Sequence, residues 1–503
     1  MSMRPWWSVL VAGILAVAAG LTALFLADRG LSGESLRVGG VPVEIVRGPA
    51  VAGASGGRPA VVVVHGYAGS GRLMRPFADT LARRGYVVLL PDLAGHGANT
   101  RRLDVPSAID PEIAAVVAHA RELPDVDPDR VTLLGHSMGA GAVVRAGAAD
   151  PRIAATVAIS LPGSGGAPGP RRLLLIVGAL EPAGFRAAGE QTAREPASGD
   201  RPVGDRRLVS VPFVEHISVL YAPRTHREAA AWLDAAVGNT ATGSGTVPLR
   251  RIAAGALTLL GALLLLTAAL GRPSHRLTPP PHDAVSGPAG LDRAAALRRP
   301  AGWIAVGGAG LLGLAGGGIG AVAVPSPVTG YLIGYFAAVG GVLAIAAAAL
   351  TGARRPSRRL SSYRPPLPRW TAVVASAGGG AAVVVPVQLG LTLMVPHGDR
   401  WWLVGALALA TAALLAGARA LAGPVWDLAV LAAIAMPLAA AAVIGLAPGF
   451  LLLIAPLVAL LFVLYALLAA VARRGGATWW SPIAAGAVMI AWPVAVALPV
   501  SVG

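Results

Sequence analysis

The distribution of apolar residues divides the chain into two parts of different kinds. In residues 30–240, short runs rich in Val, Leu and Ile alternate with segments of helical periodicity. After residue 250 the apolar runs lengthen to about 20 residues, enough for a helix to cross a ~30 Å hydrocarbon core. The pattern therefore predicts a globular part followed by a membrane part.

The short apolar runs predict strands that are buried on both faces. Seven such runs occur, at 42–47, 60–65, 86–91, 130–135, 153–160, 172–178 and 207–213. Helices are expected at 72–84, 108–122, 138–149 and 223–237. Strands of this kind separated by helices are typical of a doubly wound, mostly parallel α/β sheet. The connection 161–171 is too short for a large cap domain, so we expect an open site.

The long apolar runs predict about nine membrane spans. The first, residues 5–27, is longer than a typical signal-peptide core, which favours an uncleaved signal anchor over a cleaved signal peptide. Eight more are expected at 252–271, 301–323, 329–352, 370–395, 402–421, 427–446, 450–472 and 480–501. The expected domains are thus an anchor at 1–29, a globular domain at 30–240, a linker at 241–251 and an all-α membrane region at 252–503.

Arginine is concentrated in alternate connections between the spans. The connections 272–300 and 353–369 carry five and six arginines, and further arginines end later spans at Arg419, Arg473 and Arg474. Nine spans place all of these on one side, which the positive-inside rule makes cytoplasmic. The globular domain is then expected on the extracytoplasmic side. Arg250 and Arg251, at the outer end of the second span, are a local signal against this orientation.

The composition excludes several classes of function. The net charge is +16, but residues 1–250 hold 25 arginines against 21 acids and residues 251–503 hold 16 against four. Charge that follows the loops between spans marks topology and is not a nucleic-acid-binding stripe, so no nucleic-acid partner is expected. The absence of Cys excludes disulfides and a cysteine nucleophile. No metal-binding motif occurs, and we expect neither metal nor cofactor. Every basic residue is Arg, which is typical of a GC-rich bacterial genome.

One short motif carries a candidate nucleophile. Gly135, His136, Ser137, Met138 and Gly139 form a G-x-S-x-G sequence between a predicted strand and a predicted helix. A turn of this kind needs glycines because neighbouring backbone passes close by while the serine Oγ projects outward. The strand–turn–helix context makes Ser137 the candidate nucleophile.

A nucleophilic serine requires a base and an acid that orients the base. His216 follows the last predicted strand and is the expected base, whereas His226 lies inside the final helix and is expected to be solvated. Glu181 follows the preceding strand and is the expected acid, with Asp205 as the reserve candidate. The order Ser137, Glu181, His216 is that of one known hydrolase architecture.

An oxyanion hole requires two fixed N–H groups. The amide of Met138 is one candidate, and the amide of Tyr67, in the glycine-containing loop at Gly66, is the other. His65 and the turn at Asp92 and His96 are expected to be structural.

Five motifs in this order resemble the α/β-hydrolase superfamily over roughly residues 40–240: "HGYAGS", "PDLAGHG", "GHSMG", "GALEP" and "EHISVL". They are most similar to its dienelactone-hydrolase-like and prolyl-oligopeptidase-like branches. The resemblance implies Ser137 as nucleophile, His216 as base, Glu181 as acid, and Tyr67 and Met138 as amide donors. The departure is Glu at the position where Asp is usual.

The leading hypothesis is a membrane-embedded serine hydrolase of the esterase, lipase or thioesterase type. Its expected substrate is an acyl ester or amide, either a lipid or another component of the cell envelope. An envelope acyltransferase or a peptidase could use the same three residues. The third hypothesis is a non-catalytic hydrolase-like domain that serves a transporter or a membrane assembly.

Overall fold

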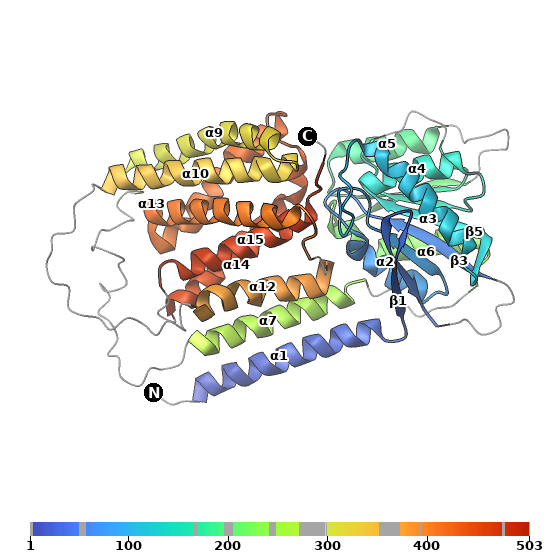
Figure 1. The fold of residues 1–503 in the computed structure, drawn as a ribbon, viewed down its shortest axis with the longest axis horizontal. Coiled ribbons are helices and arrows are strands. Elements are labelled where there is room, and N and C mark those ends of the chain that lie inside the picture. Colours follow the sequence, from blue (N-terminus) through green and yellow to red (C-terminus); the bar gives the residue numbers. More distant parts are fainter. Residues whose placement is uncertain are drawn as a thin grey trace.

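The computed structural model consists of a sheet domain that lies against one end of a bundle of helices (Figure 1). It describes residues 4–49, 57–163, 169–195, 205–240, 248–270, 297, 299–351, 373–392, 395–474 and 478–501. The predicted linker and the two arginine-rich connections lie largely outside the described residues.

The sheet has eight strands in the order β1-β2-β4-β3-β5-β6-β7-β8. Strands β3 to β8 are parallel to their neighbours, and β1 and β2 form an antiparallel edge. Their bounds are β1 Ser32–Val38, β2 Val41–Arg47, β3 Arg58–Val64, β4 Val87–Pro91, β5 Val126–His136, β6 Thr156–Ile159, β7 Leu173–Gly178 and β8 Arg206–Val211. The predicted α/β class is therefore confirmed.

Helices cover both faces of the sheet. The alternation of side chains along β3 shows why, since Val61 and Val63 pack on one side while Val62 and Val64 pack on the other. Helices α2 (Arg75–Ala82) and α6 (Pro223–Val237) cover the first face. Helices α3 (Asp110–Glu122), α4 (Met138–Ala149) and α5 (Ala183–Arg194) cover the second.

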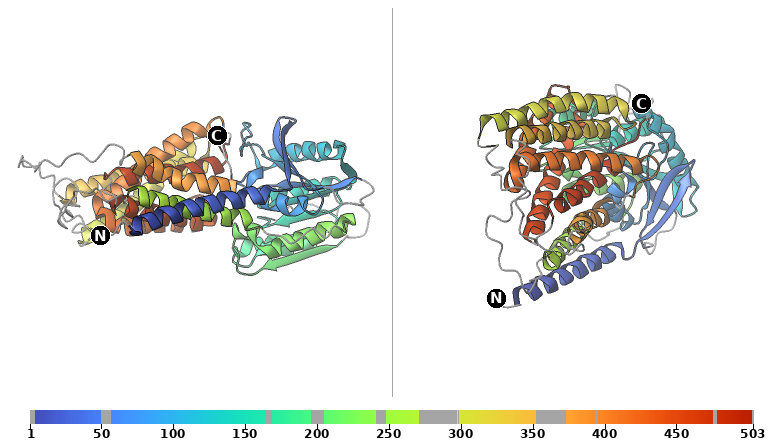
Figure 2. Two further views of the ribbon diagram at one scale, coloured as in Figure 1. Left: turned by 90° about the horizontal axis from the view of Figure 1, so that it is seen from below. Right: turned by 60° about the vertical axis from the view of Figure 1, so that its left-hand side comes forward.

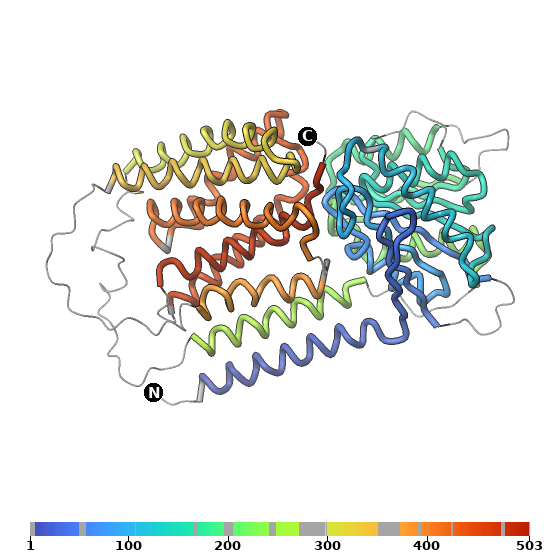
Figure 3. Tube along the Cα trace, viewed as in Figure 1, coloured from blue at the N-terminus to red at the C-terminus, as the bar shows by residue number. Residues whose placement is uncertain are grey.

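Among the residues that the structure describes, seven helical segments are long and apolar enough to cross a membrane. They comprise α1 (Arg4–Asp28), α7 (Arg250–Leu270), α9 (Pro300–Ala323), α10 (Pro327–Thr351), α14 (Phe450–Arg474) and the two halves of α13 (Arg400–Val443). The remaining two predicted spans correspond to shorter apolar helices, Val374–Gly390 and α15 (Ser481–Ala497). The trace in Figure 3 follows these segments back and forth across the bundle.

Local backbone chemistry explains how three of these helices are shaped. Gly423 has φ 72° and ψ 176°, which interrupts α13 and separates two predicted spans. The last span was predicted to reach residue 501 but its helix ends at Ala497, because Pro499 forces Leu498 into an extended conformation. On α9, a Cβ at Gly313 would lie 2.6 Å from Val339, so the glycine permits close packing on α10.

The carboxyl edge of the sheet meets the helix ends. The ring of Tyr67, in the loop after β3, lies 5.1 Å from the ring of Phe450 at the start of α14. Arg400, at the start of α13, donates hydrogen bonds to the carbonyls of Gly95 and Gly97 in the loop after β4. Val500 N donates to Gly95 O at 3.0 Å. The domain therefore lies at the helix ends opposite Arg419 and Arg473, which is the relative arrangement expected from loop charge.

Arg251 belongs to an ionic cluster at the start of α7. Its guanidinium donates to Asp79 at 2.8 Å and also to Asp28 at the end of α1. Arg75 of α2 binds the same two acids, at 3.0 Å and 3.2 Å. The cluster joins α1, α7 and the sheet domain.

Replacing Arg251 with glutamine is expected to lower the free energy of unfolding by about 1–3 kcal/mol, since two carboxylates lose a charged partner. The full-length chain in detergent should show a lower apparent Tm for this variant. The exposed neighbour provides the control, because Arg250→Gln should leave the Tm unchanged. Equal Tm values for both variants would contradict a stabilising role of the cluster.

Candidate active site

Ser137 lies at a sharp turn between β5 and α4. Its backbone has φ 53° and ψ −117°, a region that costs a non-glycine residue about 1–3 kcal/mol. The turn is possible because Gly139 has no side chain: a Cβ there would lie 2.5 Å from His65 O. Gly135 has the same role, since its Cβ would lie 2.3 Å from Gly139 O. The strained turn leaves Ser137 only partly buried at the carboxyl edge.

The structure brings Ser137, His216 and Glu181 into one hydrogen-bonded chain. His216 Nε2 lies 3.0 Å from Ser137 Oγ, and His216 Nδ1 lies 2.6 Å from Glu181 Oε1. The side chain of Glu181 is fully buried and that of His216 is 3% exposed. A carboxylate on Nδ1 and a hydroxyl on Nε2 form the geometry that lets an imidazole take a proton from serine.

Backbone hydrogen bonds hold the acid and the histidine in register. Glu181 follows β7 in a tight turn, and its Oε2 accepts from Gly178 N–H at 2.6 Å. Leu180 N donates to Val214 O at 3.0 Å, which joins this turn to the loop that carries His216. The long Glu side chain thus turns back over its own strand, which explains how a Glu at a position where Asp is usual reaches His216.

Asp205 lies at the opposite edge of the sheet. It precedes β8, is 74% exposed and pairs with Arg172 at 3.5 Å. The reserve candidate for the acid is therefore excluded by position.

His136 makes a contact that the sequence did not indicate. Its Nε2 lies 3.0 Å from the backbone carbonyl of His216, and the two rings are 4.8 Å apart. The side chain is buried, and desolvation together with the nearby His216 holds the pKa of His136 well below its usual value. A neutral ring that donates from Nε2 helps to position the His216 loop. The variable position of the elbow motif carried no signal of this role.

The glycine loop after β3 lies directly beside the nucleophile. A Cβ on Gly66 would lie 3.0 Å from Ser137 Cβ, so only glycine allows this approach. His65 is buried and accepts from Leu93 N–H at 3.1 Å, in agreement with a structural role. Asp92 accepts from Gly71 N–H and Ala98 N–H, both at 2.8 Å, and this holds the adjoining turns.

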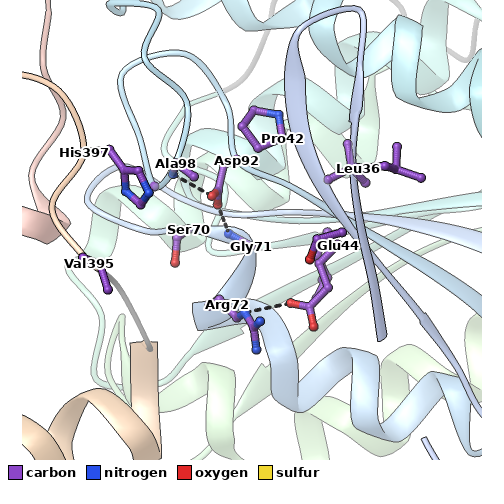
Figure 4. Close-up of a pocket in the computed structure, with 14 residues that line it drawn as sticks. Leu36, Pro42, Glu44, Ser70, Gly71, Arg72, Asp92, Ala98, Val395 and His397 are labelled. Atoms are coloured by element: carbon purple, nitrogen blue, oxygen red, sulfur yellow. Dashed lines mark hydrogen bonds and ion pairs between the residues drawn. The ribbon is translucent and has the colours of Figure 1, made fainter. Parts of the chain in front are cut away.

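A separate pocket of about 210 Å³ lies on the far side of this loop. Figure 4 shows Ser70 and Asp92 on one side of it, Glu44 and Arg72 on another, and His397 from the membrane region facing them. None of Ser137, Glu181 and His216 lines it. The pocket is thus distinct from the candidate triad.

His226 is buried, contrary to the prediction of a solvated side chain. It is 1% exposed, stacks on Phe77 at 4.0 Å and has its Nε2 2.8 Å from Leu220 O. Burial lowers the pKa of His226 to about 4. The position inside the final helix did not decide exposure: Arg224 and Arg227 of α6 are exposed, whereas His226 packs toward the sheet.

Acidification is expected to destabilise the protein through His226. The unfolded histidine takes up a proton near pH 6.5 and the folded one only near pH 4, so this contribution is complete above about pH 6.5 and is lost as pH falls toward 4. The maximum loss is about 3 kcal/mol. Thermal unfolding at pH 7.5 and pH 5.0 should show a smaller drop in Tm for His226→Gln than for the parent chain. An equal drop would contradict this assignment.

Comparisons with known proteins agree with the fold. Residues 57–182 match the family described as serine aminopeptidase, S33. The chain is 34% identical over 104 residues to the quorum-quenching protein AidA of Acinetobacter baumannii (strain MDR-ZJ06), which is 20% of this chain and 34% of that protein. It is 48% identical over 44 residues to the thermostable monoacylglycerol lipase of Bacillus sp. (strain H-257), which is 9% of this chain and 18% of the lipase.

Among solved structures, a complex of DcsB with its substrate analogue is similar. It has 15% identity and a TM-score of 0.34, and covers 41% of this chain and 100% of that one. For the two curated relatives named in the preceding paragraph, the matched segments span only 34% and 18% of the length of those proteins.

Proposed function

We propose that this α/β hydrolase, which is fused to a region of apolar helices, is a membrane-embedded serine hydrolase that cleaves an acyl ester or amide on the extracytoplasmic side. The observation that carries the proposal is the continuous chain from Ser137 Oγ through His216 to Glu181, with distances of 3.0 Å and 2.6 Å. A strained elbow that presents the serine to this imidazole is the arrangement that nucleophilic catalysis requires.

The three residues have distinct roles in the proposed reaction. Ser137 Oγ attacks the substrate carbonyl carbon while its proton passes to His216 Nε2, and Glu181 stabilises the imidazolium. The amides of Tyr67 and Met138 stabilise the negative oxygen. Collapse breaks the bond to the leaving group, which takes the proton from His216. Water then attacks the acyl-enzyme and gives a proton to His216, which passes it to Ser137 Oγ as the bond to the acyl group breaks and the acid is released.

An acyl ester is the favoured substrate. The similarity to a monoacylglycerol lipase over 44 residues supports an ester. The position of the site supports it independently, because the loop beside Ser137 contacts the end of α14 through Tyr67 and Phe450. A site next to the ends of membrane-crossing helices suits a substrate that carries an apolar acyl chain.

A membrane-impermeant fluorophosphonate applied to intact cells tests both the chemistry and the side of the membrane. We expect labelling without permeabilisation, and no labelling of Ser137→Ala. Labelling only after permeabilisation would place the domain inside and contradict the orientation. Absence of labelling in folded protein would contradict the enzyme proposal.

A further inference from the structure

Exposed large apolar side chains of the sheet domain are confined to one edge. Within the described part of residues 29–240, the side chains of this kind are Val105, Leu180 and Phe213, with 50%, 64% and 90% exposed. Val105 lies in the connection after β4, Leu180 follows β7 and Phe213 follows β8. All three therefore belong to loops at the carboxyl edge, where β strands of a parallel sheet end together.

Two of these loops also carry the candidate catalytic residues. Leu180 precedes Glu181 directly, and Phe213 lies three residues before His216. In the segments 179–185 and 212–214 the only charged residue is Glu181, whose side chain is fully buried. The exposed residues Leu180, Pro182, Pro212 and Phe213 form a surface that we call the apolar rim. The charged side chains next to it are engaged: Glu215 accepts from Ile217 N–H and Ser218 N–H, and Arg186 donates to Ser210 Oγ.

The apolar rim and the helix ends lie at the same edge of the sheet. Ser137 lies between the apolar rim and the helix ends. It is hydrogen-bonded to His216, in the rim's loop, and it lies against Gly66, the neighbour of Tyr67. Tyr67 in turn contacts Phe450 at the start of α14. In the left view of Figure 2, the end of the domain with β8 and α6 (green) extends past the helices that meet the domain. With these helices embedded in a bilayer, that part of the edge would face the lipid around the bundle.

The backbone conformation of Phe213 is a second observation that marks this edge as a functional surface. Its φ of 61° is in the left-handed region, which bulky residues rarely adopt, and the side chain is 90% exposed. Strained positions persist where the surrounding structure imposes them and are concentrated at functional sites. Exposed aromatic and aliphatic side chains are those that enter the interface of a bilayer.

We propose that the apolar rim inserts into the leaflet that surrounds the adjacent helix ends, so that a lipid-borne acyl ester reaches Ser137 directly from the membrane. The occupant of the rim is the bilayer in which the helices of the same chain are embedded. The substrate part of this inference rests on the proposed function, whereas the insertion itself does not.

Absence of cysteine from the chain makes a depth measurement straightforward. Phe213→Cys and Leu180→Cys, each carrying an environment-sensitive fluorophore, are reconstituted as the full chain in phosphatidylcholine nanodiscs with or without nitroxide-labelled lipid. Asp129→Cys, exposed near the amino end of β5, is the matched control. We expect at least twofold quenching by nitroxide lipid at 213 and 180 and little at 129. Equal behaviour at all three positions would overturn the proposal.

Two further readouts separate insertion from catalysis. The same quenching is expected in a Ser137→Ala background, so an inactive enzyme leaves the depth measurement decisive. In the active protein, Phe213→Asp should lower kcat/KM for a vesicle-borne long-chain ester at least about fivefold more than for a water-soluble short-chain ester. An equal loss on both esters would contradict delivery from the leaflet.

Discussion

Replacement of Ser137 by alanine is expected to lower ester hydrolysis by at least about 10⁴-fold. The change removes the atom that we propose forms the acyl-enzyme and leaves His216 and Glu181 in place. The remaining reaction is direct attack by water on the bound substrate, assisted by the amide donors. Its rate is a small fraction of the full rate.

The measurement is kcat/KM of purified full-length protein for a water-soluble ester. Because alanine at 137 adds no strain and removes one oxygen, the Tm should stay within about 1 °C of the parent value. Ser32→Ala, at an exposed position of β1, is the control and should keep full activity. Retention of more than a few per cent of the activity by Ser137→Ala would assign the chemistry to another residue.

Replacement of Glu181 by glutamine is expected to lower kcat by about 10⁴-fold. Glutamine preserves the size of the side chain and its hydrogen bond from Gly178 N–H, but its uncharged amide no longer stabilises an imidazolium at His216. It also allows the wrong tautomer of the ring. The effect should fall on kcat far more than on KM, because the imidazolium exists only during reaction.

Asp205→Asn supplies the matched control for this experiment. Asp205 was the other acid compatible with the sequence, but it lies exposed at the amino edge beside Arg172. We expect its kcat to stay within about twofold of the parent value. A large loss in Asp205→Asn together with a small one in Glu181→Gln would contradict the assignment of the acid.

Much of the sheet was predictable because its strands are apolar throughout. Runs such as 60–65 and 172–178 are buried on both faces and were placed within two residues of β3 and β7. The strand β1 was not predicted, since its sequence "SGESLRV" is polar and all seven of its residues are partly or fully exposed at the sheet edge. Helix α5 was also missed, because it buries only Ala188, Gly189 and Thr192.

The candidate site was predictable to the extent that chain order reflects topology. In a parallel sheet, residues that follow successive strands meet at one edge, and Ser137, Glu181 and His216 lie within hydrogen-bond distance there. Their catalytic role and the amide role of Tyr67 stay predictions.

Other features required three-dimensional contacts. No sequence signal related His136 to the His216 carbonyl, or Arg251 to Asp28 and Asp79. The apolar rim could not be predicted either, because the sequence does not tell whether the apolar residues of a loop are buried or exposed.

Covalent capture of the nucleophile tests the central claim most directly. Trypsin cleaves after Arg130 and Arg145, so residues 131–145 form one peptide in which Ser137 is the only serine. After reaction of the folded full-length protein with a fluorophosphonate, mass spectrometry should locate one adduct, on Ser137 of this peptide. Heat-unfolded protein should carry none. An unmodified 131–145 peptide from folded protein, or an adduct on another residue, would contradict the account of a serine hydrolase centred on Ser137.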